Sequence, residues 1–375
     1  MLSSTPHQII IGPPDTGKER LLRSLPAFEN ALFLNLEDHD LTTELIKNPS
    51  SLEEILKNLK PEEGLAIHRI DFIHKKHSQV LNNLFHRKDI HIIATSNTTS
   101  LNIDNSLYEQ IWTSGLPYLK VEETLSLQTV LQYGLLPKVY NLRQDSEKIS
   151  YLKKYLENYI QDEVIENSKI RNLVAFHLFL DIADEIEGEP LNFTKIAQQL
   201  DVDYKTIQNF YQLLIESRVG FYLESSKIQI RKVQKTSPKF YFFDRGLKRS
   251  IQNKFSQTLT TISGEYKKYY TAWCIGEVYK LNQIYSLNLH LSYIETKDGT
   301  GVDLVIQTPY DKIYFIYFGA NNALVKSYKK KLNRIAKSVK NTNCILVTEG
   351  FSLKNDEDLF EVLTSVQLLK KLNFL

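Results

Sequence analysis

Near its amino end the chain carries eight residues with the spacing of a phosphate-binding loop: Gly12, Pro13, Pro14, Asp15, Thr16, Gly17, Lys18 and Glu19. The loop follows an apolar run and precedes a helical pattern, the context that lets backbone N–H groups and a lysine face a polyphosphate. In a hydrolysing site the residue after the lysine is Ser or Thr, because its hydroxyl completes the Mg²⁺ shell. Here Glu19 places a carboxylate at that position, which disfavours phosphates electrostatically.

A second group of residues has the chemistry of a nucleic-acid contact. Residues 193–200 and 204–214 have the pattern of two short helices, with the small Ala197 at their crossing and Asp203 as a cap. This pattern predicts a helix-turn-helix, whose second helix presents polar side chains to a DNA groove or to a protein. The predicted DNA-contacting residues are Tyr204, Lys205, Gln208, Asn209, Gln212, Lys232 and Lys235.

Metal and thiol chemistry is not indicated. Cys274 and Cys344 stand alone in apolar surroundings, which is typical of buried thiols. Five histidines fall on different predicted elements and lack the cysteines or carboxylates of a metal site. These are His68, His74, His77, His86 and His91. We therefore predict no metal-binding residues.

The composition is typical of a soluble globular protein. The chain has 375 residues, of which 42% are hydrophobic and 24% are charged, and this length suggests two or three domains. The longest apolar runs fall far short of the roughly 18 residues that a membrane span needs. The amino terminus lacks the zones of a signal peptide. We expect a cytoplasmic protein with no membrane partner.

Basic residues gather in two segments, although the formal net charge is only +2. Residues 227–254 contain Asp244 as their single acid, and residues 326–340 contain none. Such segments can follow a phosphate backbone, but solvated helix faces have the same composition. The charge distribution leaves both interpretations open.

Strand and helix patterns alternate in the first part of the chain. The expected strands cover residues 9–11, 31–36, 64–67 and 90–95. Short apolar strands separated by helices imply a parallel sheet covered on both faces. This is the α/β layout of a nucleotide-binding domain.

The remainder divides into a helical part and a second α/β part. Apolar residues at spacings of three and four predict helices across 145–187. Aromatic runs at 221–223 and 240–243 suggest a β wing after the helix-turn-helix. Further strands are expected at 289–294, 302–306, 313–318 and 344–347. The predicted domains are residues 1–135, 136–255 and 256–375.

Several motifs occur in a characteristic order. They are the phosphate loop, residues 33–38, the turn 134–137, the helix-turn-helix, a Pro-Lys-x-Tyr-Phe-x-Asp-x-Gly-Leu segment within 237–247, and residues 302–306. In these motifs the chain resembles a broad bacterial and archaeal family of AAA-type ATPases whose carboxy-terminal domain looks like a restriction endonuclease. The resemblance implies a P-loop AAA-type parallel-sheet domain, a winged-helix middle domain and a restriction-endonuclease-like α/β tail.

The chain departs from this family where the family does chemistry on phosphates. The family's acidic pair, which holds Mg²⁺ and activates water, aligns with His68 and Arg69. Neither residue supplies the oxygen ligands that Mg²⁺ requires. The family's finger-like arginine aligns with Gln110, which cannot neutralise a transferring phosphoryl group. We therefore predict no catalytic residue in the first domain.

The tail departs from the family in the same way. Nuclease-like members of this fold use a helix Glu, a strand Asp and a Glu-x-Lys pair to bind a metal and assist the attacking water. The aligned residues are Thr271, Asp303, Tyr317 and Gly319. Only Asp303 matches, and one carboxylate makes a poor metal site. We expect no nuclease activity.

These features together predict a degenerate AAA-type protein that binds ATP weakly or not at all and is not an enzyme. It would act as a nucleic-acid or protein-binding scaffold. The alternative is an active ATPase with a DNA-binding winged helix, in which Asp71 stands in for the lost acidic pair. A third interpretation is a sequence altered by drift or design that has no surviving activity. An oligomer stays open, since AAA proteins commonly assemble as hexamers.

Overall fold

The chain forms two compact units. The computed structural model describes residues 7–25, 31–48, 50–57, 64–73, 78–113, 115–160, 170, 172–228, 230, 234–257, 259–260, 264–297, 301–319, 339, 342–349 and 360–372. Unit 1 comprises Met1–Gly115 with Glu216–Arg218, and unit 2 comprises Leu116–Ile215 with Val219–Leu375. Residues on both sides of the predicted boundary at 255 therefore belong to unit 2.

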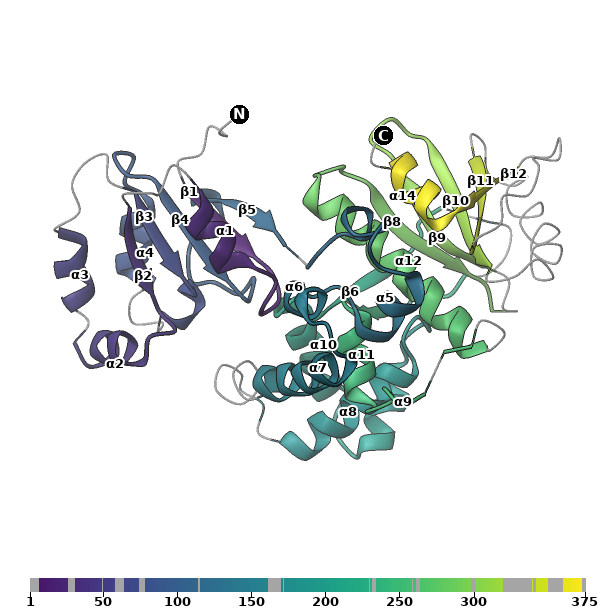
Figure 1. The fold of residues 1–375 in the computed structure, drawn as a ribbon, viewed down its shortest axis with the longest axis horizontal. Helices are drawn as coiled ribbons and strands as arrows, with labels where there is room; N and C mark the ends of the chain where they lie inside the picture. Colours follow the sequence, from purple (N-terminus) through teal and green to yellow (C-terminus); the bar gives the residue numbers. More distant parts are fainter. Residues whose placement is uncertain are drawn as a thin grey trace. The chain divides into compact units, whose positions relative to one another are not determined.

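Unit 1 is built on a five-stranded parallel sheet (Figure 1). The strands are β1 (His7–Ile11), β2 (Leu32–Asn35), β3 (Leu65–His68), β4 (Ile92–Ser96) and β5 (Glu109–Trp112). Their order is β2-β3-β4-β1-β5, and every pairing is parallel. The loop after β1 therefore leaves from an interior strand.

Helices cover both faces of this sheet. They are α1 (Lys18–Ser24), α2 (His39–Lys47), α3 (Ser50–Lys57) and α4 (Ser78–Phe85). Ile10 packs with Leu22 of α1, whereas Ile9 and Ile11 belong to a second core that leucines of α2, α3 and α4 line. Successive residues of β1 are thus buried on opposite faces, as expected for a parallel sheet. Each such buried side chain contributes roughly 1.5–3 kcal/mol.

The first part of unit 2 is helical. Its helices are α5 (Leu127–Tyr133), α6 (Pro137–Asn141), α7 (Asp145–Tyr159), α8 (Leu173–Glu185), α9 (Phe193–Leu200), α10 (Tyr204–Glu216) and α11 (Arg245–Ile251). The helices α9 and α10 lie where the helix-turn-helix pattern predicts them. Phe179 of α8 meets Phe210 and Tyr211 of α10 with ring centroids 5.2 and 4.7 Å apart. This aromatic core fixes the inward face of α10.

A seven-stranded mixed sheet forms the rest of unit 2 (Figure 1). Its strands are β6 (Gly220–Ser225), β7 (Lys239–Phe242), β8 (His290–Glu295), β9 (Gly301–Gln307), β10 (Ile313–Gly319), β11 (Thr342–Thr348) and β12 (Phe360–Thr364). Their order is β12-β11-β10-β9-β8-β6-β7. The helices α12 (Gly264–Ile284) and α14 (Ser365–Leu372) pack against its apolar residues.

The predicted β wing is part of this larger sheet. β6 pairs antiparallel with β7, with Phe221 opposite Tyr241. It also pairs in parallel with β8, with Glu224 opposite Ser292. The hairpin that follows α10 is therefore joined by backbone hydrogen bonds to the carboxy-terminal strands.

Among the described helices, none combines the length and the apolar character that a membrane crossing requires.

Candidate functional site

The loop between β1 and α1, which carries the predicted phosphate-binding residues, places strict limits on its two glycines. A Cβ atom on Gly12 would lie 2.2 Å from the Thr113 carbonyl oxygen, so only glycine fits against β5 here. Gly17 has a φ of 87°, in the left-handed region that favours glycine. Gly12 is thus required by its contact with Thr113, and Gly17 by the conformation of the turn.

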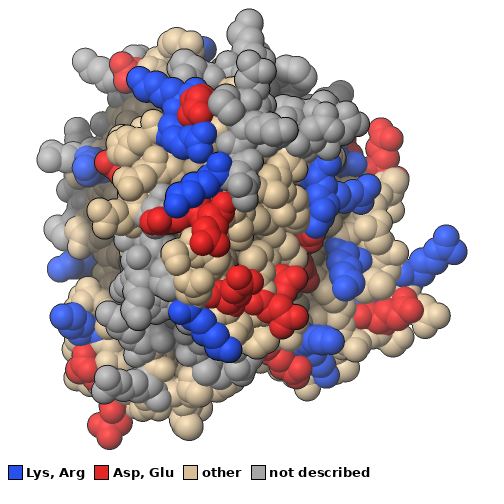
Figure 2. All heavy atoms as spheres, turned by 90° about the vertical axis from the view of Figure 1, so that its left-hand side faces the viewer, with Lys and Arg blue, Asp and Glu red and all other residues tan. Residues whose placement is uncertain are grey.

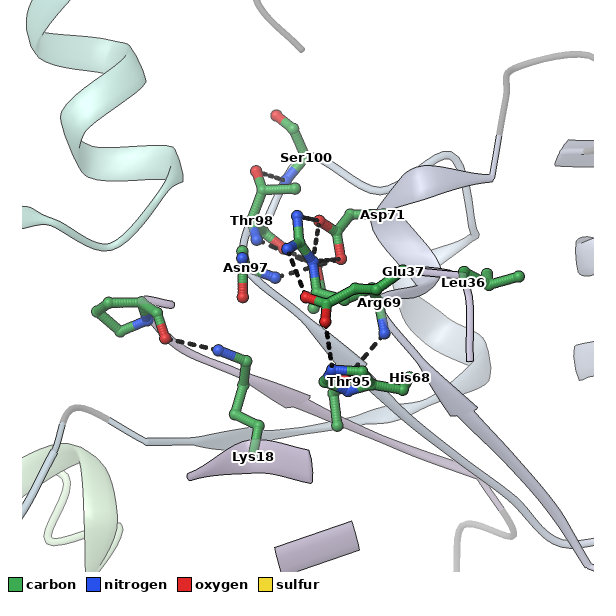
Figure 3. Close-up of polar contacts among 12 residues, drawn as sticks. Lys18, Leu36, Glu37, His68, Arg69, Asp71, Thr95, Asn97, Thr98 and Ser100 are labelled. Atoms are coloured by element: carbon green, nitrogen blue, oxygen red, sulfur yellow. Dashed lines mark hydrogen bonds and ion pairs between the residues drawn. The ribbon is translucent and has the colours of Figure 1, made fainter. Parts of the chain in front are cut away.

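Lys18 lies within the loop and is only 4% exposed. Its Nζ donates hydrogen bonds to the carbonyl oxygens of Gly12 (2.9 Å) and Pro13 (2.6 Å). Figure 3 shows the Lys18 side chain reaching back toward this turn. The position of the ammonium is therefore set by the loop carbonyls.

Glu19 contacts two basic residues. Its Oε1 accepts a hydrogen bond from Arg23 Nε at 2.9 Å, and its Oε2 lies 4.0 Å from His68 Nε2. The carboxylate at the Ser or Thr position of the motif is thus compensated by side chains of the protein.

His68 ends β3 and contacts the neighbouring strand. Its Nδ1 lies 2.7 Å from Thr95 Oγ1, and its Nε2 lies 3.7 Å from Glu37 Oε2. The carboxylates of Glu19 and Glu37 thus both face Nε2. The same Thr95 hydroxyl accepts a hydrogen bond from the backbone N–H of Arg69 (3.0 Å).

The Arg69 guanidinium is buried between two carboxylates (Figure 3). Nε donates to Asp71 Oδ2 at 3.0 Å, and Nη2 lies 2.9 Å from the same oxygen. Nη1 donates to Glu37 Oε1 at 3.1 Å. The guanidinium carbon lies 3.9 Å from the centre of the Phe72 ring. Arg69 therefore holds Asp71 and Glu37 at the same end of the sheet.

The Glu37 carboxyl is strongly acidic in this setting. Its interaction with His68 lowers the pKa of Glu37 to about 2, and the charge of Arg69 acts in the same direction against the effect of burial. Glu37 is therefore ionised at neutral pH.

These residues do not fit Mg²⁺, which requires oxygen ligands that are free to bind it. The Asp71 oxygens accept hydrogen bonds from Arg69 and from the Asn97 backbone N–H (3.3 Å). Within the described part of the chain, no group of three or more His, Cys, Asp and Glu residues is arranged to hold a metal ion. The residue suggested as a substitute metal ligand is thus already bound by an arginine.

The residue that aligns with the family's finger-like arginine is part of a strand. Gln110 lies within β5 and pairs with Ile9 of β1. It belongs to the sheet of its own unit and is only partly exposed.

Three described carboxylates of the tail are bound by protein groups. Asp303 Oδ2 accepts a hydrogen bond from Phe318 N–H at 3.0 Å, and burial raises the Asp303 pKa. Glu295 is paired with Lys235 (2.6 Å) and Lys239 (2.9 Å). Glu277 is paired with Lys280 at 2.7 Å. Thr271 lies on α12, and Tyr317 and Gly319 lie on β10.

The predicted DNA-contacting residues of α10 share one face. Ile207, Phe210, Tyr211 and Leu214 are buried. The exposed residues are Tyr204, Lys205, Gln208, Asn209 and Gln212. Gln208 Nε2 lies 3.4 Å from the Tyr204 hydroxyl, to which it donates. Lys235 is bound to Glu295 instead, and Lys232 lies outside the described residues.

The surface in Figure 2 shows how charges are distributed on one face of the molecule. Asp and Glu side chains gather near the middle, with Lys and Arg side chains around and between them. On that face the described residues form no continuous basic surface.

Sequence reasoning does not identify the buried ion cluster of unit 2. The Glu187 carboxylate is bound by both Nη atoms of Arg245, at 2.8 and 2.7 Å, and lies 3.2 Å from Lys248 Nζ. Lys248 Nζ also lies 3.1 Å from Asp184 Oδ1. The available signal was the density of basic residues in α11, where Arg245, Lys248 and Arg249 fall within five positions, because such residues are rarely buried without partners.

Residues 124–258 match a protein-family model that is described as a domain of unknown function (DUF8612). The matched segment contains the helices α5 to α11 and the hairpin of β6 and β7. A search of curated proteins gave no match.

Proposed function

We propose that this chain is a P-loop protein of the AAA type that does not hydrolyse nucleotide and acts as a scaffold. Its DNA-contacting surface would be the exposed face of α10. The observation that carries the proposal is the pairing of Arg69 with Asp71 and Glu37 at the carboxyl end of β3. Hydrolysing P-loop proteins need acids available for Mg²⁺ and water at such an edge.

Three features support the loss of hydrolysis. The residue after Lys18 is a carboxylate rather than a hydroxyl, and it is bound to Arg23. The strand end carries His68 and Arg69 in place of acids. Gln110 lies in a strand and carries no positive charge. Each change removes an element of transition-state stabilisation, so their combined effect is expected to exceed that of any one.

The parent chain is therefore expected to release phosphate from ATP and Mg²⁺ no faster than a Lys18→Ala variant does. The measurement is a coupled phosphate assay on the purified chain. Calorimetric titration of ATP with and without Mg²⁺ tells weak binding from none. Release that disappears in Lys18→Ala would contradict the proposal and favour the active-ATPase alternative.

The chemistry of the α10 face supports a DNA contact. Amide side chains such as Gln208 and Asn209 can pair with adenine in the major groove, and Lys205 can contact a phosphate. Tyr204 is 46% exposed beside them. The face offers one cation, so base and groove contacts would supply more of the affinity than charge.

Binding of a mixed set of duplexes, measured by fluorescence anisotropy, is expected to weaken about tenfold in Gln208→Ala, since a base contact is worth about 1–3 kcal/mol. Lys205→Ala should reduce the slope of log affinity against log salt by about 1. Lys312→Ala, on the exposed β9–β10 turn, is the matched control and should change neither. No binding at low salt would remove DNA as the partner of α10.

A further inference from the structure

The carboxyl ends of β2, β3 and β4 are joined by one set of side-chain contacts. Glu37 follows β2, Arg69 follows β3 and Asn97 follows β4. Because parallel strands end at the same edge, these residues lie close together (Figure 3). Arg69 contacts Glu37 on one side and Asp71 on the other, and Asp71 accepts from the Asn97 N–H. The Arg69 guanidinium and the Asp71 carboxylate that it binds thus connect three strand ends.

In a hydrolysing P-loop site, a divalent ion and the phosphates occupy this edge and are contacted by its acids. The residues of this chain do not fit that ion, as described above. We propose that Arg69 acts as an internal cation that holds the ends of β2, β3 and β4 together in place of a divalent ion. The arrangement of this edge then depends on neither Mg²⁺ nor nucleotide.

The geometry of Arg69 favours this role over a passive surface contact. Its side chain is 5% exposed and that of Asp71 is 4% exposed. The planar guanidinium directs separate N–H groups at two carboxylates, which a lysine ammonium does not do in a fixed geometry. Arg69 also has a φ of 59°, in the left-handed region that is costly for residues other than glycine. The ion pairs of Arg69 with Asp71 and Glu37 must offset this conformational free energy.

His68 extends the connection to the phosphate loop. Its Nε2 lies 4.0 Å from Glu19 and 3.7 Å from Glu37. The start of α1 is therefore tied to the same edge. Three carboxylates, those of Glu19, Glu37 and Asp71, are compensated by protein side chains.

The test uses the full chain, which contains two tryptophans: Trp112 in unit 1 and Trp273 in unit 2. In a Trp273→Phe background, urea unfolding followed by Trp112 fluorescence reports unit 1. Arg69→Ala is expected to raise the unfolding equilibrium constant of unit 1 at least about 100-fold, because it leaves Asp71 buried without its partner. Arg23→Ala is the matched control and should change it less than about fivefold, since Arg23 is 53% exposed in its ion pair.

Mg²⁺ added without nucleotide should leave the urea midpoint of the parent protein unchanged. If Arg69→Ala does not fold, Arg69→Lys is measured instead. It should raise the unfolding equilibrium constant of unit 1 more than Arg23→Ala does. A midpoint that rises with Mg²⁺, or an Arg69 variant no weaker than Arg23→Ala, would overturn the proposal.

A charge-reversed variant tests the replacement directly. His68→Asp with Arg69→Glu restores an acidic pair at the end of β3, so its midpoint should rise with Mg²⁺ while that of the parent does not. If Mg²⁺ does not raise the midpoint of this variant, a divalent ion does not bind at this edge, and the proposal that Arg69 replaces such an ion is contradicted. The readouts concern unit 1 alone, so their failure would leave DNA binding by α10 unaffected.

Discussion

Glu187→Gln is expected to destabilise unit 2 by about 3–5 kcal/mol, because breaking a buried ion pair leaves its partners uncompensated. The Glu187 carboxylate binds Arg245 through two contacts and also accepts the Phe242 backbone N–H at 2.8 Å. Burial alone would raise the pKa of Glu187, but Arg245 and Lys248 lower it to about 2. The measurement is urea unfolding of the full chain in a Trp112→Phe background, in which Trp273 reports unit 2.

Asp184→Asn is the matched control, since Asp184 is buried in the same cluster. Burial raises its pKa to about 6, although Lys248 opposes the shift. Compared with the unfolded chain, the folded state therefore favours the protonated form of Asp184. An amide side chain mimics that uncharged form. At pH 7.5 the variant should lose little or no stability. Equal losses in the two variants would contradict the assignment of Glu187 as the essential anion of the cluster.

The two carboxyls act in opposite directions as pH changes. The lowered pKa of Glu187 gives stability that is present above about pH 4.5 and is lost as pH falls toward 2. The raised pKa of Asp184 gives stability that is present below about pH 4 and is lost as pH rises through 6, by about 3 kcal/mol. Asp184→Asn should abolish the loss of stability as pH rises through 6 and leave the loss as pH falls toward 2 intact.

Asp244→Ala is expected to cost about 3–5 kcal/mol, because three buried backbone N–H groups lose their acceptor. Asp244 Oδ2 accepts from Leu135 at 2.7 Å, and Oδ1 accepts from Gly246 (2.9 Å) and Leu247 (3.1 Å). The residue thus caps α11 and also holds the turn after α5. The same tryptophan fluorescence measurement applies.

Asp203→Ala provides the comparison for Asp244. Asp203 caps α10 by accepting from Thr206 N–H at 2.8 Å, but it is exposed. Its replacement should cost about 1 kcal/mol, as is usual for a cap that water can replace. Similar losses for the two aspartates would show that burial of Asp244 does not decide its importance.

Elements with a strong periodic pattern were predictable from the sequence. The apolar runs at 9–11 and 90–95 became interior strands, and the pattern at 193–200 became α9. β5 was not predicted, because Glu109-Gln110-Ile111-Trp112 is short and begins with two polar residues. It forms a strand because β1 offers it a pairing edge, which is a tertiary effect.

The candidate site was predictable in its residues but not in its contacts. The glycine and lysine spacing identified the loop, and the replacement of the acidic pair was visible at His68 and Arg69. The pairing of Arg69 with Glu37 joins residues 32 positions apart and requires the parallel order of β2 and β3. No local pattern contains that information.

The double pairing of β6 limits how this protein can be dissected. A fragment stopping at residue 258, where the family match ends, would keep β6 but lose β8, its parallel neighbour. Part of that strand would then present unsatisfied amides and carbonyls to other molecules, a common cause of aggregation. The helices α9 and α10 are best isolated together with the strands that follow them.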